Sequence, residues 1–328
     1  MELNWRNLGK KIWKRTWQIA LVLFCTLLVL ELAYRFQWID FYKTEYKALN
    51  ISVRKNQPNV LVFGDSFTAY PKGYVGRFRK EYPKLNVINC AMPGSGPYEM
   101  ELIASRRIDA HPPKGIIYQM YVGNDLTDLN PPVNWGALSF SRNCYWSAKP
   151  YFEVLGLLSR RLSGLQSDFD PKKLKQDEAD FSTSMYSPRT KMMIRASSNY
   201  INESILISEN MEGAAEKAKE SIAYLRELVP SKVPIYVVVI PHFSQVSMNY
   251  NANYEQLSGH KTDMKLNYPL LKEISKVKGV TVLNPMRYFR KMEAQGKQLY
   301  FNNDPHLNED GQLALFEYLH QKTNNLWQ

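Results

Sequence analysis

Cysteine is the scarcest residue type in this sequence, with 3 among 328 residues. A fold that is stabilised mainly by disulfide bonds needs many more cysteines, so a disulfide framework is excluded. Cys25 lies in a long apolar run, and Cys90 lies in a shorter run that is expected to form part of the core. A bridge between Cys90 and Cys144 stays open as the less favoured alternative.

Several chemical signatures are also missing. Cysteines and histidines do not recur at the spacing of metal ligands, and Gly94-Ser95-Gly96 continues without the later glycine of a dinucleotide-binding loop. The sequence holds neither a nucleic-acid motif nor a dense basic stripe. We therefore expect no metal, no cofactor and no nucleic acid partner. The histidines without ligand spacing are His111, His260 and His320.

Acidic residues are outnumbered, since 42 lysines and arginines stand against 31 aspartates and glutamates, for a net charge of +11. Residues 1–16 contain five basic residues and Glu2, or +4, which leaves +7 for the rest of the chain. Such an excess suits an acidic surface, such as anionic lipid or an anionic polysaccharide. A modestly basic solvated surface is the plainer alternative.

A single long hydrophobic run extends from Trp17 to Ala33. Its length is just sufficient for a helix to span a bilayer, and the basic residues before it indicate a cytoplasmic amino terminus. We predict a cytoplasmic segment at 1–16 and an uncleaved transmembrane signal anchor at 17–34. Everything beyond it would then be periplasmic or extracellular.

Two other interpretations of this run are weaker. A cleaved signal peptide needs small residues before its cleavage site, but Glu31-Leu32-Ala33 puts a glutamate at the −3 position. A buried helix of a soluble protein does not account for the basic cluster that precedes it.

Short apolar runs recur at wide spacing after a linker at 35–57, and helical patterns separate several of them. Strands that alternate with helices indicate an α/β domain with a parallel sheet between two helical layers, here at 58–328. The expected strands are Val60–Phe63, Val87–Cys90, Ile116–Val122, Ile235–Ile240 and Val280–Leu283. The expected helices are 73–82, 98–110, 209–228, 266–277 and 309–323.

The segment between the third and fourth expected strands is far longer than a crossover requires. Its part at 130–208 lacks a steady hydrophobic period, and we interpret it as an insertion. Such insertions commonly form a lid or a substrate wall on a rigid scaffold. A mobile loop without a role is the alternative.

Four polar segments follow strands or precede a helix. Because the carboxyl ends of parallel strands share one edge of a sheet, we expect these segments to meet there. Each alone could be an ordinary turn or helix cap, but their order favours a common site. They are Gly64-Asp65-Ser66-Phe67, the loop 89–98, Gly123-Asn124-Asp125 and Asp304-Pro305-His306.

These residue types suit nucleophilic catalysis. A serine hydroxyl needs a base to take its proton, and His306 is the natural base for Ser66. Asp304 lies two residues before His306, where an extended chain places both side chains on one side, so it can orient the imidazole. The backbone N–H groups of Ser66 and Gly94 and the side chain of Asn124 can stabilise an oxyanion.

This set of motifs resembles the SGNH (GDSL-type) hydrolase superfamily, in particular its membrane-anchored, periplasmic esterases and O-acetyltransferases. The resemblance implies a three-layer α/β/α fold like flavodoxin, a parallel sheet in the order 2-1-3-4-5, and ester chemistry without a cofactor. It assigns Ser66 as nucleophile, Gly94 and Asn124 as oxyanion donors, His306 as base and Asp304 as its acid. Asp65 is expected to hold the turn by hydrogen bonds.

The sequence departs from the family pattern at two places. Val122 replaces the first glycine of the third motif, and Asn303 occupies the usual position of the acid, three residues before the histidine. His242 and Tyr98 are further candidates for substrate contact at the same edge. For His242 a solvent-exposed loop position is the alternative, and Tyr98 can instead pack in the core.

The motifs favour a membrane-anchored, extracytoplasmic serine esterase that acts on an acylated cell-envelope carbohydrate or a similar ester. The alternative is an O-acyltransferase that modifies an envelope polysaccharide, with the polysaccharide machinery as partner. A non-catalytic glycan-binding or scaffold module is the third hypothesis. A binding module has no need of a base, so His306 counts against it.

Overall fold

The structure is a computed structural model, and its described part of the chain forms two compact units. The first combines residues 1–41 with 138–165, and the second combines 42–137 with 166–328. The described residues are 5–50, 53–54, 56–123, 125–126, 129, 144–145, 147–149, 151–164, 212–261, 269–301 and 304–328.

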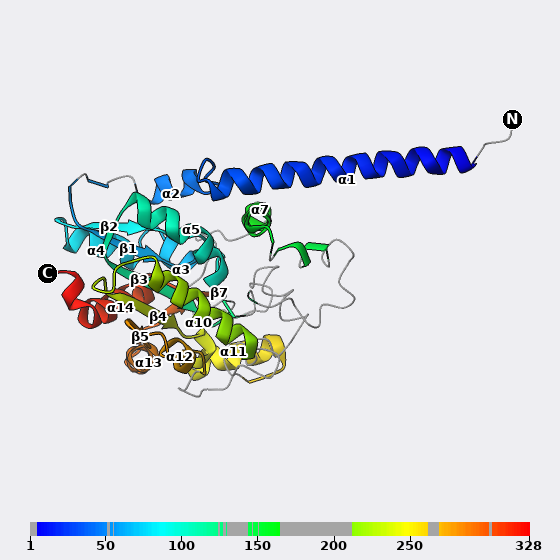
Figure 1. Cartoon of the computed structure of the whole chain (residues 1–328). Helices are drawn as coiled ribbons and strands as arrows, with labels where there is room; N and C mark the ends of the chain where they lie inside the picture. The colour runs from blue at the N-terminus through cyan, green and yellow to red at the C-terminus, as the bar shows by residue number, and fades with distance from the viewer. Residues whose placement is uncertain are drawn as a thin grey trace. The chain divides into compact units, whose positions relative to one another are not determined.

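The second unit is built on a five-stranded parallel sheet in the order β2-β1-β3-β4-β5 (Figure 1). This order and all five strands were predicted, and the fold class is confirmed. The strands are β1 (Asn59–Phe63), β2 (Asn86–Asn89), β3 (Pro113–Tyr121), β4 (Ile235–Ile240) and β5 (Val280–Leu283).

The central strands are apolar because both of their faces are covered. Every residue of β4 is buried, as are Val60 to Phe63 of β1. Continuous valine and isoleucine runs of this kind are typical of parallel sheets under two helical layers. The unbroken apolar runs therefore made these strands predictable from sequence.

Helices cover the two faces of this sheet in the doubly wound manner (Figure 1). In one layer, α10 (Glu212–Glu227) contacts α5 (Pro97–Ala110) and α12 (Pro269–Ile274). In the other, α14 (Glu309–Lys322) contacts α4 (Tyr74–Glu81) and α13 (Met286–Ala294). The chain that leaves β1 therefore enters the layer that contains α4 and α14.

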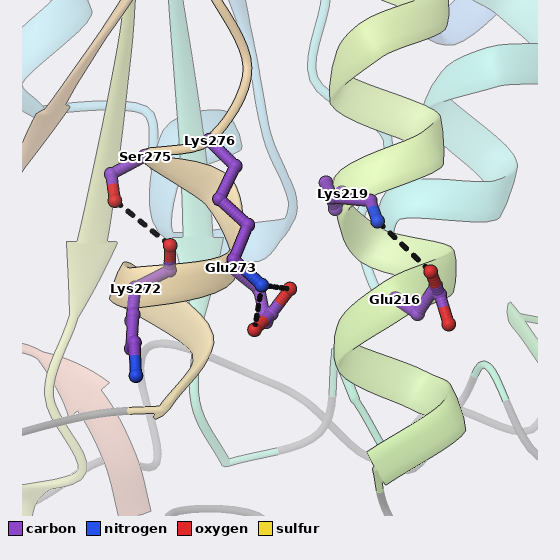
Figure 2. Close-up of polar contacts among 6 residues, drawn as sticks. All are labelled: Glu216, Lys219, Lys272, Glu273, Ser275 and Lys276. Carbon is purple, nitrogen blue, oxygen red and sulfur yellow. Dashed lines mark hydrogen bonds and ion pairs between the residues drawn. The ribbon is translucent and has the colours of Figure 1, made fainter.

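Short-range ion pairs lie on α10 and at the end of α12 (Figure 2). Lys219 lies 2.9 Å from Glu216, and Lys276 lies 2.5 Å from Glu273. Exposed pairs of this type add little to the stability of the fold. Each pair joins residues three positions apart in the chain, so these contacts are local.

The sequence did not predict several elements, or gave them other bounds. The helix predicted at 266–277 is α12, which ends at Ile274. Missed were α11 (Met248–Ser258), α13, and the antiparallel pair of β6 (Tyr300–Phe301) with β7 (Asp304–Leu307). Missed too were α3 (Ser66–Ala69) and the short 3₁₀ helices η6 (Phe243–Gln245) and η7 (Asn324–Leu326).

The first unit consists of the long helix α1 (Trp5–Arg35) and α7 (Glu153–Gly164). Within it, Glu31 is buried and its carboxylate accepts from the N–H of Val154 at 3.0 Å and from Arg35 at 2.7 Å. The glutamate that interrupts the apolar run thus caps another helix. Helix α7 lies inside the segment 130–208, where no helix was predicted, and the interpretation of that segment as an insertion stays a prediction.

The residues just before β1 are built into the second unit. Helix α2 (Lys43–Leu49) is followed by its C-cap, Asn50. The side chain of Asn50 donates to the carbonyl of Asn89 at 2.7 Å and accepts from the N–H of Asn89 at 2.8 Å. The guanidinium of Arg79 also donates to Asn50, at 2.6 Å. Part of the expected linker therefore extends the hydrogen bonding of β2.

Candidate active site

Ser66 lies at the first position of a four-residue helix, α3, just beyond the end of β1. Asp65 is the N-cap, and its carboxylate accepts from the N–H of Phe67 at 2.9 Å. The predicted structural role of Asp65 is therefore confirmed. The cap turns the chain so sharply that Ser66 reaches the edge of the sheet, where its side chain is half-buried.

Gly64 permits this turn because no side chain fits there. Its φ is +156°, and a Cβ would lie 2.2 Å from the hydroxyl of Thr68 and 2.5 Å from Oε1 of Gln119. Those two groups are hydrogen-bonded to each other at 2.8 Å, and Gln119 also accepts from the N–H of Asp65 at 3.2 Å. The turn and the strand β3 are thereby held in close contact.

Replacing Gly64 by alanine should cost about 1–3 kcal/mol of unfolding free energy, because the added methyl group must displace a buried hydrogen-bonded pair. Gly296→Ala is the matched control: its φ is +82°, but a Cβ there would meet nothing within 4 Å. Denaturant titration of both variants checks this, and an equal loss in both would contradict the packing argument.

The strand β7 carries His306 and Asp304 to Ser66 from 240 residues away. The Oγ of Ser66 lies 2.6 Å from Nε2 of His306, and Nδ1 of His306 is hydrogen-bonded to Asp304. The same carboxylate oxygen accepts from the backbone N–H of His306 at 2.9 Å. Because a carboxylate only accepts, Nδ1 carries the hydrogen and Nε2 is left to accept from the serine.

Aromatic packing fixes the plane of this imidazole. The ring of Phe67 stacks on His306 at 4.8 Å with an interplanar angle of 29°, and its other neighbour is Tyr121 at 4.6 Å. Phe67 follows the serine directly in the chain. The residue that packs against the imidazole is thus part of the turn that holds the hydroxyl.

The loop after β2 is tied to the same turn. The carbonyl of Gly64 accepts from the N–H of Met92 at 2.9 Å and from the hydroxyl of Ser95 at 3.4 Å. Between them, Gly94 takes a left-handed φ of +70°, which favours glycine. Among the described residues, the backbone N–H groups of Ser66 and Gly94 have no hydrogen-bond acceptor, as oxyanion donors require.

The third predicted oxyanion donor, Asn124, lies outside the described residues. Its neighbour Asp125 is buried and accepts from the N–H of Tyr121 at 2.9 Å. The backbone that leads out of β3 is therefore held by a carboxylate. The role of Asn124 stays a prediction.

The two candidates for substrate contact differ in their surroundings. His242 is 1% exposed, contacts the hydroxyl of Ser244 at 2.5 Å, and packs between Tyr121 and Tyr254. Burial lowers its pKa to about 3, so the imidazole is neutral. The expectation of an exposed loop position was wrong, and a side chain this deeply buried offers no surface to a substrate. Tyr98 is half-buried on α5, and its role stays a prediction.

Burial raises the pKa of Asp65 to about 6, against the opposing effects of the Phe67 N–H and the nearby His306. The pKa of this carboxyl group is higher in the folded state than its unfolded value of 3.8, so the folded state binds the proton more tightly. Its contribution to the free energy of unfolding is therefore fully present below pH 3.8. That contribution is lost as the pH rises through 6. The buried charge therefore weakens the fold at neutral pH.

Asp65→Asn keeps the capping oxygen and removes the charge. Relative to the parent, it should gain on the order of 3 kcal/mol of unfolding free energy between pH 4 and pH 7.5. Denaturant titrations at several pH values measure this difference. A difference that does not change with pH for Asp65→Asn would refute the burial of an ionisable group.

All three cysteines are free, and Cys90 is buried in the core, as favoured from sequence. Burial raises the pKa of its thiol to about 12, so it is unreactive. Among the residues that the structure describes, no three histidine, cysteine or carboxylate side chains gather as metal ligands.

Sequence reasoning missed the buried amides that hold α3. The side chain of Asn89 donates to the carbonyl of Thr68 at 2.9 Å and accepts from the N–H of Ala91 at 3.0 Å. Asn89 thus joins the nucleophile turn to the loop of Gly94. A polar residue at the end of an apolar strand was the available signal, but nothing local showed its partners.

No family model and no curated protein matches this chain. Several solved structures do, among them TesA, with 11% identity, a TM-score of 0.41, and coverage of 82% of this chain and 99% of that one. The acetyl xylan esterase AlAXEase has 9% identity and a TM-score of 0.43, and the match covers 81% of this chain and 99% of that one. A lipolytic G-D-S-L family protein from Veillonella parvula has 10% identity and a TM-score of 0.40, and the match covers 81% of this chain and 98% of that one. Identities and TM-scores this low carry no argument about chemistry, so a function can be inferred only from the residues of this chain.

Proposed function

We propose that this protein is a membrane-anchored serine esterase with a Ser66–His306–Asp304 triad. The observation that carries the proposal is the continuous chain of contacts from the Ser66 hydroxyl through the imidazole to the carboxylate. A binding module would have no use for a base aligned on a hydroxyl. The predicted family resemblance points to the same chemistry.

In the first half of the reaction, Nε2 of His306 takes the proton of Ser66 as Oγ attacks the ester carbonyl. Asp304 stabilises the imidazolium that forms. The N–H groups of Ser66 and Gly94 would donate to the oxyanion, and each such donor is typically worth about 2.7–4 kcal/mol. The imidazolium then protonates the departing alkoxide, which leaves an acyl group on Ser66.

In the second half, His306 takes a proton from water, whose oxygen attacks the acyl-serine. Collapse of the second tetrahedral intermediate releases the carboxylic acid and returns the proton to Ser66. No cofactor enters either half. Attack by a sugar hydroxyl in place of water would transfer the acyl group to that sugar.

We infer the location from α1. Its segment Gly9–Arg35 is long and apolar enough to cross a membrane, and the basic residues at its start favour a cytoplasmic amino terminus. The unit that carries Ser66 would then face the periplasm or the exterior. Its net positive charge suits an acylated, anionic envelope carbohydrate as substrate.

The test uses the full chain in detergent. Release of acetate from p-nitrophenyl acetate is followed with and without candidate envelope glycans, beside Ser66→Ala. Glycan-independent release that is lost in Ser66→Ala supports the esterase. Acceleration by a glycan that itself becomes acetylated selects the transferase. Absence of turnover, with glycan bound equally by the parent and Ser66→Ala, selects the scaffold.

A further inference from the structure

A buried glutamine links the two halves of the site. Gln312 lies on α14, the helix that begins directly after β7 and its His306, and it is 1% exposed. Its amide nitrogen donates to the carbonyl of Phe67 at 2.9 Å, and its amide oxygen accepts from the N–H of Tyr74 at 3.1 Å. One side chain therefore binds both helices that follow the nucleophile.

The two bonds satisfy backbone groups that short helices leave open. The four-residue α3 cannot pair its own carbonyls, and Gly73, the N-cap of α4, has no side chain with which to cap Tyr74. A Cβ at Gly73 would lie 2.8 Å from the amide oxygen of Gln312. Glycine at this position lets the amide reach the end of α4.

A primary amide of this length can serve both helices. Phe67 presents an acceptor and Tyr74 presents a donor, so the partner must donate and accept at once. A glutamate would lack the donor, a lysine would lack the acceptor, and an apolar side chain would lack both. The orientation of the Gln312 amide is fixed by the same two partners.

The connection from Gln312 back to the base is short and rigid. Asn308 is the N-cap of α14, accepting from Gly311 at 2.9 Å, and its carbonyl accepts from the N–H of Gln312 at 2.9 Å. Its amide donates to the carbonyl of Gln298 at 2.8 Å, next to the β6–β7 pair. Only Leu307 separates Asn308 from His306 in the chain. Gln312 is thus connected to His306 through the first turn of α14 and Asn308.

We propose that Gln312 is a positioning residue that sets the distance between Oγ of Ser66 and Nε2 of His306. The proposal rests on the proposed function. Gln312 acts through Phe67, whose carbonyl it holds and whose ring packs on the imidazole. Without it, α14 and α3 are free to move relative to each other, and a displacement of about 1 Å between reacting groups can cost about 10²-fold in rate.

The test compares Gln312→Met with Thr323→Val in the full chain. Thr323 is a buried polar residue at the other end of α14, where it accepts from the indole N–H of Trp327 at 2.9 Å. Both substitutions remove a buried polar group from the same helix, so both should lower the melting temperature. Steady-state hydrolysis of p-nitrophenyl acetate is measured well below melting, with the folded fraction determined by circular dichroism.

Gln312→Met should lower kcat about 10²-fold with KM unchanged, and the rate of Ser66 labelling by a fluorophosphonate should fall in parallel. Thr323→Val should leave both rates at the parent value. Gln312→Glu keeps the acceptor for Tyr74 but not the donor to Phe67, and it should show a similar loss. That variant decides the matter if the methionine variant does not fold.

Parent-like kcat and labelling in Gln312→Met or Gln312→Glu would overturn the positioning role and leave the esterase standing. A parent chain that neither hydrolyses esters nor is labelled would overturn both proposals.

Discussion

Replacing His306 by alanine is expected to lower kcat for ester hydrolysis by about 10⁴–10⁶, the scale seen when one member of a catalytic triad is removed. The imidazole lies 2.6 Å from the Ser66 hydroxyl, and no other described histidine is hydrogen-bonded to that serine. Without a base the hydroxyl stays protonated and weakly nucleophilic. Steady-state kinetics with p-nitrophenyl acetate measure the loss.

His260→Ala is the matched control, since His260 is exposed and stands apart from the site. It should keep parent kinetics. A loss of less than tenfold in His306→Ala would mean that another group activates the nucleophile, and the assignment of the base would fail.

The second large effect is expected at Asp304. Asp304→Asn keeps an oxygen for the backbone N–H of His306 but removes the negative charge beside Nδ1. The imidazolium formed in each half-reaction then lacks its counter-charge, so kcat should fall by about 10³–10⁴. Labelling of Ser66 by a fluorophosphonate should slow in proportion.

Asp310→Asn, six residues further along and exposed on α14, provides the control. Parent-like kcat in Asp304→Asn would leave the carboxylate a merely structural acceptor. Asn303, three residues before His306 in the chain, would then need its own substitution.

Strands and site residues could be predicted because their signals are local. Val60 to Phe63 and Ile235 to Ile240 are apolar on both faces, which only a covered sheet permits. Parallel strands end at one edge, so Ser66 was expected near His306, and the geometry brings them together. The catalytic roles themselves remain proposals.

The missed elements depend on distant partners. Asp304-Pro305-His306-Leu307 is polar and short, and it becomes a strand only by pairing with β6. The carboxylate that caps helix α7, Glu31, lies 123 residues before Val154 in the chain. From the sequence alone, a polar residue such as Glu31 does not show which distant group it will bind, so its hydrogen bond becomes visible only in the structure.

Gln312 belongs to the same group. In the sequence it is one polar residue near the start of a predicted helix. Its two partners, Phe67 and Tyr74, are more than two hundred residues away. Its proposed role follows from three-dimensional contacts and from the need of short helices for outside hydrogen-bond partners.

The nucleophile is tested most directly by trapping the acyl-enzyme. The full chain is mixed with p-nitrophenyl acetate, quenched in acid within the first turnover, digested and mapped by mass spectrometry. The account predicts an acetyl group on Ser66 of the parent, and neither acetylation nor turnover in Ser66→Ala. Turnover that persists in Ser66→Ala, or an acetyl group on a different residue of an active parent, would contradict it.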